Sequence, residues 1–296
     1  MSDIREIRMH MESVRDTKKV TSAMYMIAAT KMRKAKADLD STRPYFDAVR
    51  AEIKRVFRVD TTVESPYLYP AGEHDLPGDY AYLIITADKG LAGAYNSSVI
   101  KEAERLSKEH ASRFFVIGEF GRHYFTGHGI PYEKDFLFTA QNPTLQRARV
   151  IAARLLGLYQ RGEVSKIFVV YTDLKTGVYQ EAHVGRILPF HRGDFVIPKE
   201  EKKITKPFYF YPSVSEVLDN MVESYVAGYV YSAMVDSFCC EQNSRMNAMD
   251  EANSNADELL AELKTAYNHE RQGKITKEIT EVSSGAKALA RKKHKK

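Results

Sequence analysis

The stretch TSAMYMIAATKMRKAK, residues 21–36, places apolar side chains on nearly every side of a helix and ends in a run of bases. Followed outward in alternating steps of three and four residues, it belongs to a seam that begins at Ile4 and ends at Val56. Such a heptad seam predicts one long helix, within residues 1–60, that packs along a second helix. We expect a kink or a frayed turn at Pro44. The seam positions are Ile4, Ile7, Met11, Val14, Lys18, Thr21, Tyr25, Ala28, Met32, Ala35, Leu39, Thr42, Phe46, Val49, Ile53 and Val56, of which only Lys18, Thr21 and Thr42 are polar.

A second seam occupies the C-terminal part of the chain, and no proline follows Pro212. Residues 212–290 are therefore predicted to form another long helix, which pairs antiparallel with the first. A bundle folded back on itself would need turns that neither segment supplies. Small residues at Ala28, Ala35, Gly228 and Ala256 would let the two backbones approach closely. The seam consists of Val214, Leu218, Met221, Tyr225, Val235, Cys239, Met246, Met249, Ala256, Leu260, Leu263 and Tyr267. It is broken by Gly228, Ser232, Gln242 and Asn253. After Tyr267 the phase slips by one residue, and the seam continues at Ile275, Ile279, Val282, Ala286 and Leu289.

The middle of the chain, residues 61–211, alternates apolar runs with helical patterns. After a connector rich in proline and glycine, the order is strand, helix, strand, helix and then two strands around a turn. This order predicts a small open α/β sheet of the Rossmann-like kind. The predicted fold class is thus α/β with a long antiparallel coiled coil. The expected domains are 1–60 (helix), 61–211 (α/β domain with connectors), 212–290 (helix) and 291–296 (basic tail).

Composition limits the class of protein. The formal net charge is +5, and ARKKHKK at the end supplies five bases and no acid, so the rest of the chain is about neutral. The opening sequence mixes acids and bases, unlike a secretory or transit peptide, and indicates a cytoplasmic start. No apolar run approaches the about 20 residues that span a bilayer. Cys239 and Cys240 are adjacent, which argues against a disulfide and favours a reducing compartment.

Catalytic motifs are not found. The chain has no G-x-x-x-x-G-K-[ST] and no G-x-G-x-x-G after a strand. The nearest phosphate-binding candidate is ADKGLAGAYN, residues 87–96, for which a tight turn is the favoured interpretation. The neighbours Asp88 and Lys89 make a weak acid and base pair. The histidines His123, His128, His183 and His191 lack the spacing of a metal site.

The bases near the first stretch form a local cluster. From residue 17 to residue 37 there are six bases and no acid, namely Lys18, Lys19, Lys31, Arg33, Lys34 and Lys36. On a helix these side chains make a positive surface suited to an acidic partner or to phosphates. A solvated helix face would also explain the bases. It would not explain the apolar Met24, Met26 and Ile27 away from the seam, which indicate a helix surrounded by partners.

Four stretches give the chain its resemblance to a known family. In order along the chain they are TKKVTSAMYMIAATKMRKAK, ITADKGLAGAYN, EQNSRMNAMDEANSNADELL and RQGKITKEITEVSSGAKAL. Together they resemble the γ subunit of the rotary F-type ATP synthase over essentially the whole chain. The resemblance implies that the two terminal helices form a shaft inside a ring of three α and three β subunits. Rotation of the shaft would then couple ion flow to ATP synthesis or hydrolysis at sites of the β subunits.

The resemblance also implies partners and contact residues. The partners would be the α and β subunits, the ε subunit on the α/β domain and a ring of membrane c subunits, with no nucleic acid and no direct membrane contact. The chain would hold no catalytic residue, cofactor or metal, and would lie at the cytoplasmic side of a bacterial cell membrane. The implied contacts with the catalytic ring are Met24, Lys31, Arg33, Lys34, Arg245, Arg271, Gln272, Thr276, Glu278 and Glu281, and those on the side of the c-ring and ε are Phe208, Tyr209, Phe210 and Tyr211.

Three departures from the family pattern stand out. Gly273 takes the place of a usual alanine and loosens the helix, Tyr211 takes the place of a frequent acid, and the basic tail is extra. Two other classes stay open at this point. A nucleic-acid binder would use the basic cluster on phosphates, although the chain has no recognised DNA motif. A nucleotide enzyme would need the loop from Gly90 to Gly93 to bind phosphate.

Overall fold

The computed structural model describes residues 4–59, 65–69, 76–109, 111–173, 181–191 and 209–293. The chain divides into two compact units. One unit consists of Met1–Ile27 with Met246–Lys296, and the other is Ala28–Arg245. Two long helices, α1 (Ile4–Val59) and α5 (Val214–Lys293), each contribute to both units. The helix bounds are close to the sequence expectation, and α1 continues through Pro44.

The larger unit contains a sheet of four strands in the order β2-β1-β3-β4. These strands are β1 (Tyr80–Ile85), β2 (Ser112–Ile117), β3 (Lys166–Thr172) and β4 (Ala182–Leu188). The first three are parallel, and β4 pairs antiparallel with β3. The small open α/β sheet predicted from the sequence is confirmed. The remaining helices are α2 (Tyr95–Glu109), α3 (Glu119–Gly127) and α4 (Leu145–Gln160). The short α3 was not predicted.

Helices cover both faces of the sheet, which explains why every residue of β1 is buried. Tyr82 and Ile84 point to one face and share a core with α2 and α3. Leu83 points to the other face and lies in a core with α4 and α5. This alternation is the period of two that a strand requires. The apolar run of β1 is therefore typical of a parallel strand covered on both sides.

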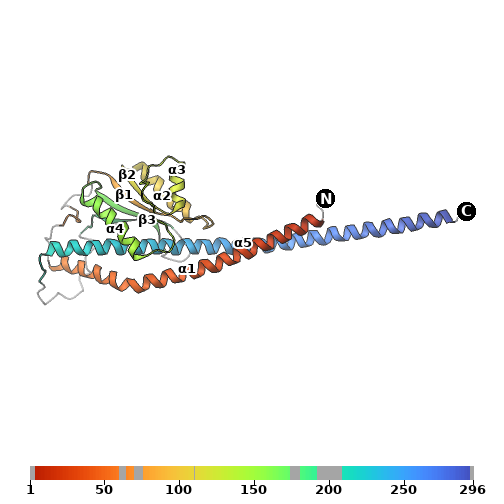
Figure 1. Ribbon diagram of the computed structural model, residues 1–296, viewed down its shortest axis with the longest axis horizontal. Coiled ribbons are helices and arrows are strands. Elements are labelled where there is room, and N and C mark those ends of the chain that lie inside the picture. The colour runs from red at the N-terminus through yellow and green to blue at the C-terminus, as the bar shows by residue number, and fades with distance from the viewer. Residues whose placement is uncertain are drawn as a thin grey trace. The chain divides into compact units, whose positions relative to one another are not determined.

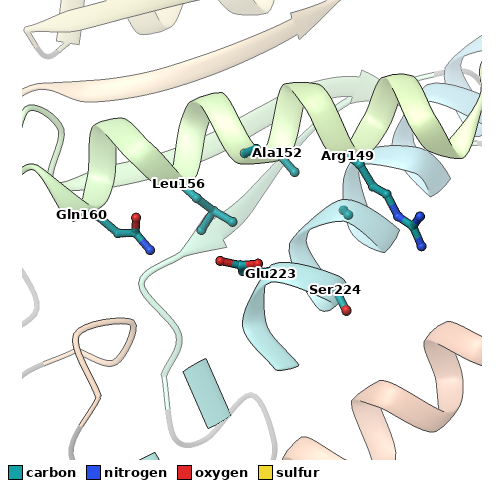
Figure 2. Close-up of a pocket in the computed structure, with 8 residues that line it drawn as sticks. Arg149, Ala152, Leu156, Gln160, Glu223 and Ser224 are labelled. Carbon is teal, nitrogen blue, oxygen red and sulfur yellow. The ribbon is translucent and has the colours of Figure 1, made fainter. Parts of the chain in front are cut away.

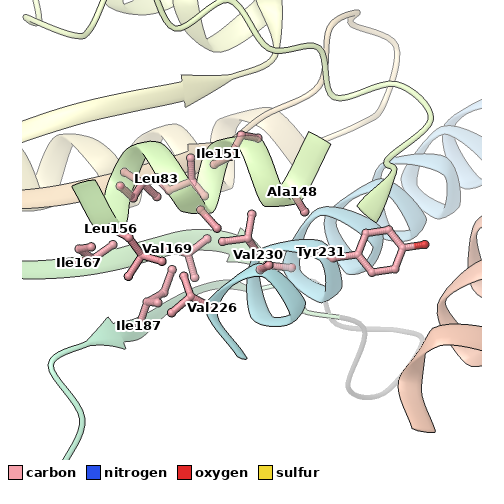
Figure 3. Packing of buried hydrophobic residues seen from close by; sticks show 14 of the residues in the cluster. Leu83, Ala148, Ile151, Leu156, Ile167, Val169, Ile187, Val226, Val230 and Tyr231 are labelled. Carbon is pink, nitrogen blue, oxygen red and sulfur yellow. The ribbon is translucent and has the colours of Figure 1, made fainter. Parts of the chain in front are cut away.

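In the larger unit α5 acts as one of the helices that cover the sheet. Figure 3 shows Val226 and Val230 of α5 pointing toward β3 and α4, where Val169 and Leu156 lie. The two valines are 0% exposed. The approach is close at β4, because a Cβ added to Gly185 would lie 2.3 Å from the hydroxyl of Tyr229. The opposite side of the same α5 stretch packs on α1 (Figure 1).

The α1–α5 pairing is antiparallel in the larger unit. Cys239 approaches the carbonyl of Met32 at 3.9 Å, whereas the earlier residue of α5, Gly228, meets the later residue of α1, Phe46. A Cβ on Gly228 would lie 2.1 Å from the Phe46 ring. This close approach confirms the expectation that a small residue lets the backbones come together. Burial of Ala28 at 1% exposure and of Ala35 at 7% fits the same pattern.

The smaller unit is also antiparallel, but its seam is partly polar. The ammonium of Lys18 pairs with the Asp257 carboxylate, and the hydroxyl of Thr21 donates to Asn253 Oδ1 at 2.5 Å. Ser22 donates to the same oxygen at 3.2 Å. Such polar seam pairs fix the register of a coiled coil at some cost in stability. The breaks that the sequence shows at Thr21 and Asn253 are thus paired with one another.

Candidate functional surfaces

The ADKGLAGAYN loop is held by its own polar side chains. Asp88 accepts hydrogen bonds from the backbone N–H of Glu119 at 3.0 Å and from those of Ala140 and Gln141, both at 3.1 Å, and from the hydroxyl of Thr139. Its carboxylate therefore joins the start of α3 to the turn at residues 139–141. These hydrogen bonds explain, without a bound phosphate, why an aspartate stands at position 88.

Thr86, just before this loop, and Asn96 at its end also bind the backbone. The hydroxyl of Thr86 donates to the carbonyl of Ile117 at 2.9 Å, and Asn96 Oδ1 accepts from the N–H of Ala87 at 2.9 Å. Leu91 and Gly93 have φ values of 60° and 51°, in the left-handed region that favours glycine. These contacts support the tight-turn interpretation of the motif.

A partly buried chain of polar contacts connects α1, α5 and two loops of the larger unit. Arg245 donates to Glu241 Oε1 at 2.6 Å and to the carbonyl of Gly90 at 3.1 Å. The amide of Gln141 donates to the same Glu241 oxygen at 3.4 Å and accepts from the ammonium of Lys31 at 3.2 Å. We call Lys31, Gln141, Glu241 and Arg245 the polar latch. Burial raises the pKa of Glu241, and the hydrogen bond from Arg245 opposes that rise.

The latch includes two residues that the sequence resemblance assigned to partner contacts. Lys31 is half-buried, and Arg245 is 9% exposed, so this guanidinium faces mainly its own chain. Glu241 and Gln141 were missed by the sequence reasoning. The i, i+4 spacing of Glu241 and Arg245 on a helix was the available signal. Nothing in the sequence pointed to Gln141, because it comes from a loop.

The other expected contact residues of α1 lie at the surface to different degrees. In the smaller unit Met24 is half-buried, while Met26 and Ile27 are 68% and 55% exposed. In the larger unit Arg33 and Lys34 are exposed. Large apolar side chains exposed in this way typically indicate a partner surface.

The end of α5 is exposed on all sides. Every residue from 271 to 287 is exposed, although the stretch is helical. Ile275, Ile279 and Val282 form an apolar stripe at helical spacing and are 43%, 63% and 74% exposed. Within the described part of the chain no segment covers these three side chains. The expected contact residues in this stretch are Arg271, Gln272, Thr276, Glu278 and Glu281.

The aromatic segment before α5 is partly described. Tyr209 and Tyr211 are 93% and 92% exposed, and Phe210 packs against the main core. Phe208 lies outside the described residues. Two exposed tyrosines next to an anchored phenylalanine make a surface that another chain could contact.

The described residues were also compared with the requirements of a small-ligand site and of a metal site. A hollow of about 330 Å³ lies between α4 and α5, with Arg149 on one helix and Glu223 on the other (Figure 2). Its lining has no histidine, cysteine or pair of carboxylates. Among the described residues no group of three or more His, Cys, Asp or Glu is placed to hold a metal ion. No described helix is both long and apolar enough to cross a membrane.

Solved structures share this arrangement of helices and sheet. The chain matches the central stalk and c-ring structure of the Tetrahymena thermophila mitochondrial ATP synthase with a TM-score of 0.58 and 26% identity, covering 79% of this chain and 99% of that one. It matches the fold of a chain in the Euglena gracilis mitochondrial ATP synthase (OSCP/F1/c-ring) with a TM-score of 0.65 and 15% identity, covering 97% and 94%. The fold is therefore that of an ATP synthase central-stalk subunit.

Sequence comparisons give the family. The family model described as ATP synthase matches residues 3–289. The ATP synthase gamma chain of Caldanaerobacter subterraneus subsp. tengcongensis is 41% identical, covering 95% of this chain and 98% of that protein. That of Ruminiclostridium cellulolyticum is 36% identical, covering 97% and 99%. The chain belongs to the ATP synthase gamma chain family, which sets aside the nucleic-acid binder and the separate nucleotide enzyme.

Proposed function

We propose that this chain is the rotor shaft of an F-type ATP synthase and turns inside a ring of three α and three β subunits. The observation that carries the proposal is the α5 stretch 271–287, a helix exposed on all sides that bears an apolar stripe. An apolar stripe on an unpaired helix is expected to be covered in the assembled state. A surrounding ring covers such a helix from every direction, whereas a single partner helix covers one face.

Rotation exchanges the states of the catalytic sites because the shaft is asymmetric. One shaft cannot contact three identical β subunits in the same way, so each β site has a different nucleotide affinity at any given angle. About 1.4 kcal/mol of differential contact corresponds to a tenfold change in affinity. Coupling therefore needs several kcal/mol of contact spread over many residues. Turning the shaft by ion flow would drive ATP synthesis, and ATP hydrolysis would turn it in reverse.

The proposed contacts are those that the family resemblance implies, and exposure indicates how directly each could face the ring. We propose that Arg33 and Lys34 face an acidic surface of β, and that Lys31 contributes charge from the edge of the latch. Arg245 is mostly buried, so its contribution to the ring passes chiefly through the loop at Gly90. The remaining proposed ring contacts are Met24, Arg271, Gln272, Thr276, Glu278 and Glu281. The α/β part would carry ε, and the segment from Phe208 to Tyr211 would lie near the c-ring.

The chain is proposed to contribute no reacting group of its own. The engaged side chains of the ADKGLAGAYN loop support this, since Asp88 and Asn96 already bind the backbone. No cofactor is expected. The subunit would be a peripheral part of the complex at the cytoplasmic side of a bacterial cell membrane, held there by partner subunits.

Reconstitution with α and β subunits tests the proposal directly. A bead is attached to the α/β part, the ring is fixed to a surface, and ATP is supplied. We expect stepwise rotation in one direction, in thirds of a turn. A stable complex that hydrolyses ATP without rotation of the bead would contradict the rotor role.

A further inference from the structure

We propose that the polar latch is the positioning device that sets the rotational orientation of α1 and α5 against the sheet and resists twisting between them. Its central positioning residues are Glu241 and Gln141. This inference rests on the proposed rotor function, because a shaft under load needs such a fixed orientation.

Apolar packing alone fixes orientation poorly. The α5 residues that cover the sheet include Val222, Val226 and Val230, all 0% exposed. The hydrophobic effect that buries them is non-directional and depends mainly on area. Close packing, as at Gly185 and Gly228, hinders large rolls of the helix, and polar contacts add a dependence on angle. Resistance to twisting needs contacts whose energy depends on angle.

The latch supplies contacts of that kind. A hydrogen bond prefers an angle above about 150° and weakens steeply below about 120°, and hydrogen bonds to charged groups are the stronger ones. Glu241 is 1% exposed, so its carboxylate cannot replace a lost partner with bulk water. Rolling α5 would pull Glu241 away from Gln141 and Arg245 away from the Gly90 carbonyl. Both movements break a link between α5 and a loop, while the Glu241–Arg245 ion pair within α5 stays.

The latch also joins three parts of the unit in series. Lys31 belongs to α1, Glu241 and Arg245 belong to α5, and Gln141 lies in the loop between α3 and α4. The backbone N–H of Gln141 is held by Asp88, which links the latch to the start of α3. A twist of either long helix is thus transmitted to the sheet by hydrogen bonds. Fixing the register between packed helices is the best-established role of buried ionic groups.

Gln141→Leu is the decisive variant, because it removes both side-chain links of Gln141 and leaves the Glu241–Arg245 ion pair in place. Glu241→Leu and Glu241→Gln form a second comparison. Leucine removes the acceptor at position 241, whereas glutamine keeps an oxygen for Arg245 and Gln141. Glu52→Gln serves as the control, since it alters an ion pair with Arg55 on the surface of α1.

The first readout is the distance distribution between spin labels in the full chain. Labels are placed at the exposed positions Ser41 on α1 and Ser97 on α2, both in the larger unit. The native thiols do not compete for the label, because burial raises the pKa of Cys239 to about 11 and that of Cys240 to about 12. We expect a broader distribution in Gln141→Leu and in Glu241→Leu, a width close to wild type in Glu241→Gln, and no change in Glu52→Gln.

The second readout is the torsional stiffness of the reconstituted complex, taken from the angular fluctuation of the bead while the ring is held in one nucleotide state. We expect Gln141→Leu to lower this stiffness with only a small drop in the thermal unfolding midpoint of the chain, because Glu241 loses one partner and keeps Arg245. Unchanged label distances and unchanged stiffness in Gln141→Leu, in a wild-type complex that rotates, would overturn the latch and leave the rotor function intact. Broadened distances in a chain whose wild-type complex does not rotate would support the latch and contradict the rotor.

Discussion

Two stretches of the same helix differ completely in their surroundings. Residues 222–241 of α5 are buried on most sides between α1 and the sheet, and residues 271–287 are exposed on every side. Both stretches have apolar side chains at helical spacing, so the sequence pattern alone treats them alike. Periodicity therefore predicts which face of a helix is apolar, whereas the burial of that face depends on whether another part of the chain covers it. The uncovered stretch is the one that we assign to partners.

The largest expected difference between the stretches comes from truncating a core side chain. Met234 is 2% exposed, so Met234→Ala leaves a cavity and should cost about 2–5 kcal/mol of unfolding free energy. Ile279 is 63% exposed, and Ile279→Ala should change the stability of the isolated chain by less than about 0.5 kcal/mol. Urea denaturation of the two variants measures both values. Equal losses would mean that the exposed stretch is covered in the free chain.

Two glycines of α5, one in each stretch, should respond in opposite ways to replacement by alanine. Gly228→Ala should destabilise the chain by about 1–3 kcal/mol, because the new methyl group would overlap the Phe46 ring. Gly273 has open space around it, and Gly273→Ala should stabilise the helix by up to about 1 kcal/mol. Thermal unfolding followed by circular dichroism measures both shifts. A stabilising Gly228→Ala would contradict the close α1–α5 approach.

The buried stretch should also show a pH dependence that the exposed one lacks. Burial, helped by the charge of Asp173, raises the pKa of Asp236 to about 6, against the opposing hydrogen bond from Ser232 and the charge of Arg43. Because this folded-state pKa lies above the unfolded value of about 4, the folded chain binds more protons between those limits. The contribution of Asp236 to stability is therefore greatest at low pH and is lost as the pH rises through about 6.

Removing that carboxyl group should remove the dependence. Asp236→Asn is expected to be about 1–2 kcal/mol more stable than wild type at pH 7.5, with the difference shrinking toward pH 4.5. Urea denaturation across this range measures the change. The matched control is Asp250→Asn on the exposed side of α5, which should follow the wild-type curve. A constant difference between Asp236→Asn and wild type would exclude titration of Asp236 as its source.

The sequence predicted the long helices well because their signal is local and repeated. Ile7, Met11, Ile53 and Val56 of the α1 seam are all buried, as the heptad pattern requires, while Tyr25 is the seam position that stays 36% exposed. The strands were predicted for a similar reason, since a sheet covered on both faces needs continuous apolar runs. The division into four domains stays a prediction.

Features that depend on distant residues could not be predicted. Helix α3 contains Gly121, which has low helix propensity but is required because a Cβ there would lie 2.6 Å from the Thr86 hydroxyl. The latch was missed because Gln141 is about 100 residues away from Glu241 along the chain. The exposure of residues 271–287 could not be predicted either, because the seam pattern of α5 does not show how far the pairing with α1 extends.

Hydrogen exchange of the α5 amides, in the free chain and in the complex with α and β subunits, tests most directly whether the exposed stretch is the partner surface. Amides of residues 222–241 should be protected in both states. Amides of residues 271–287 should exchange rapidly in the free chain and become protected in the complex. Rapid exchange of residues 271–287 in an assembled, ATP-hydrolysing complex would show that this stretch is not the partner surface.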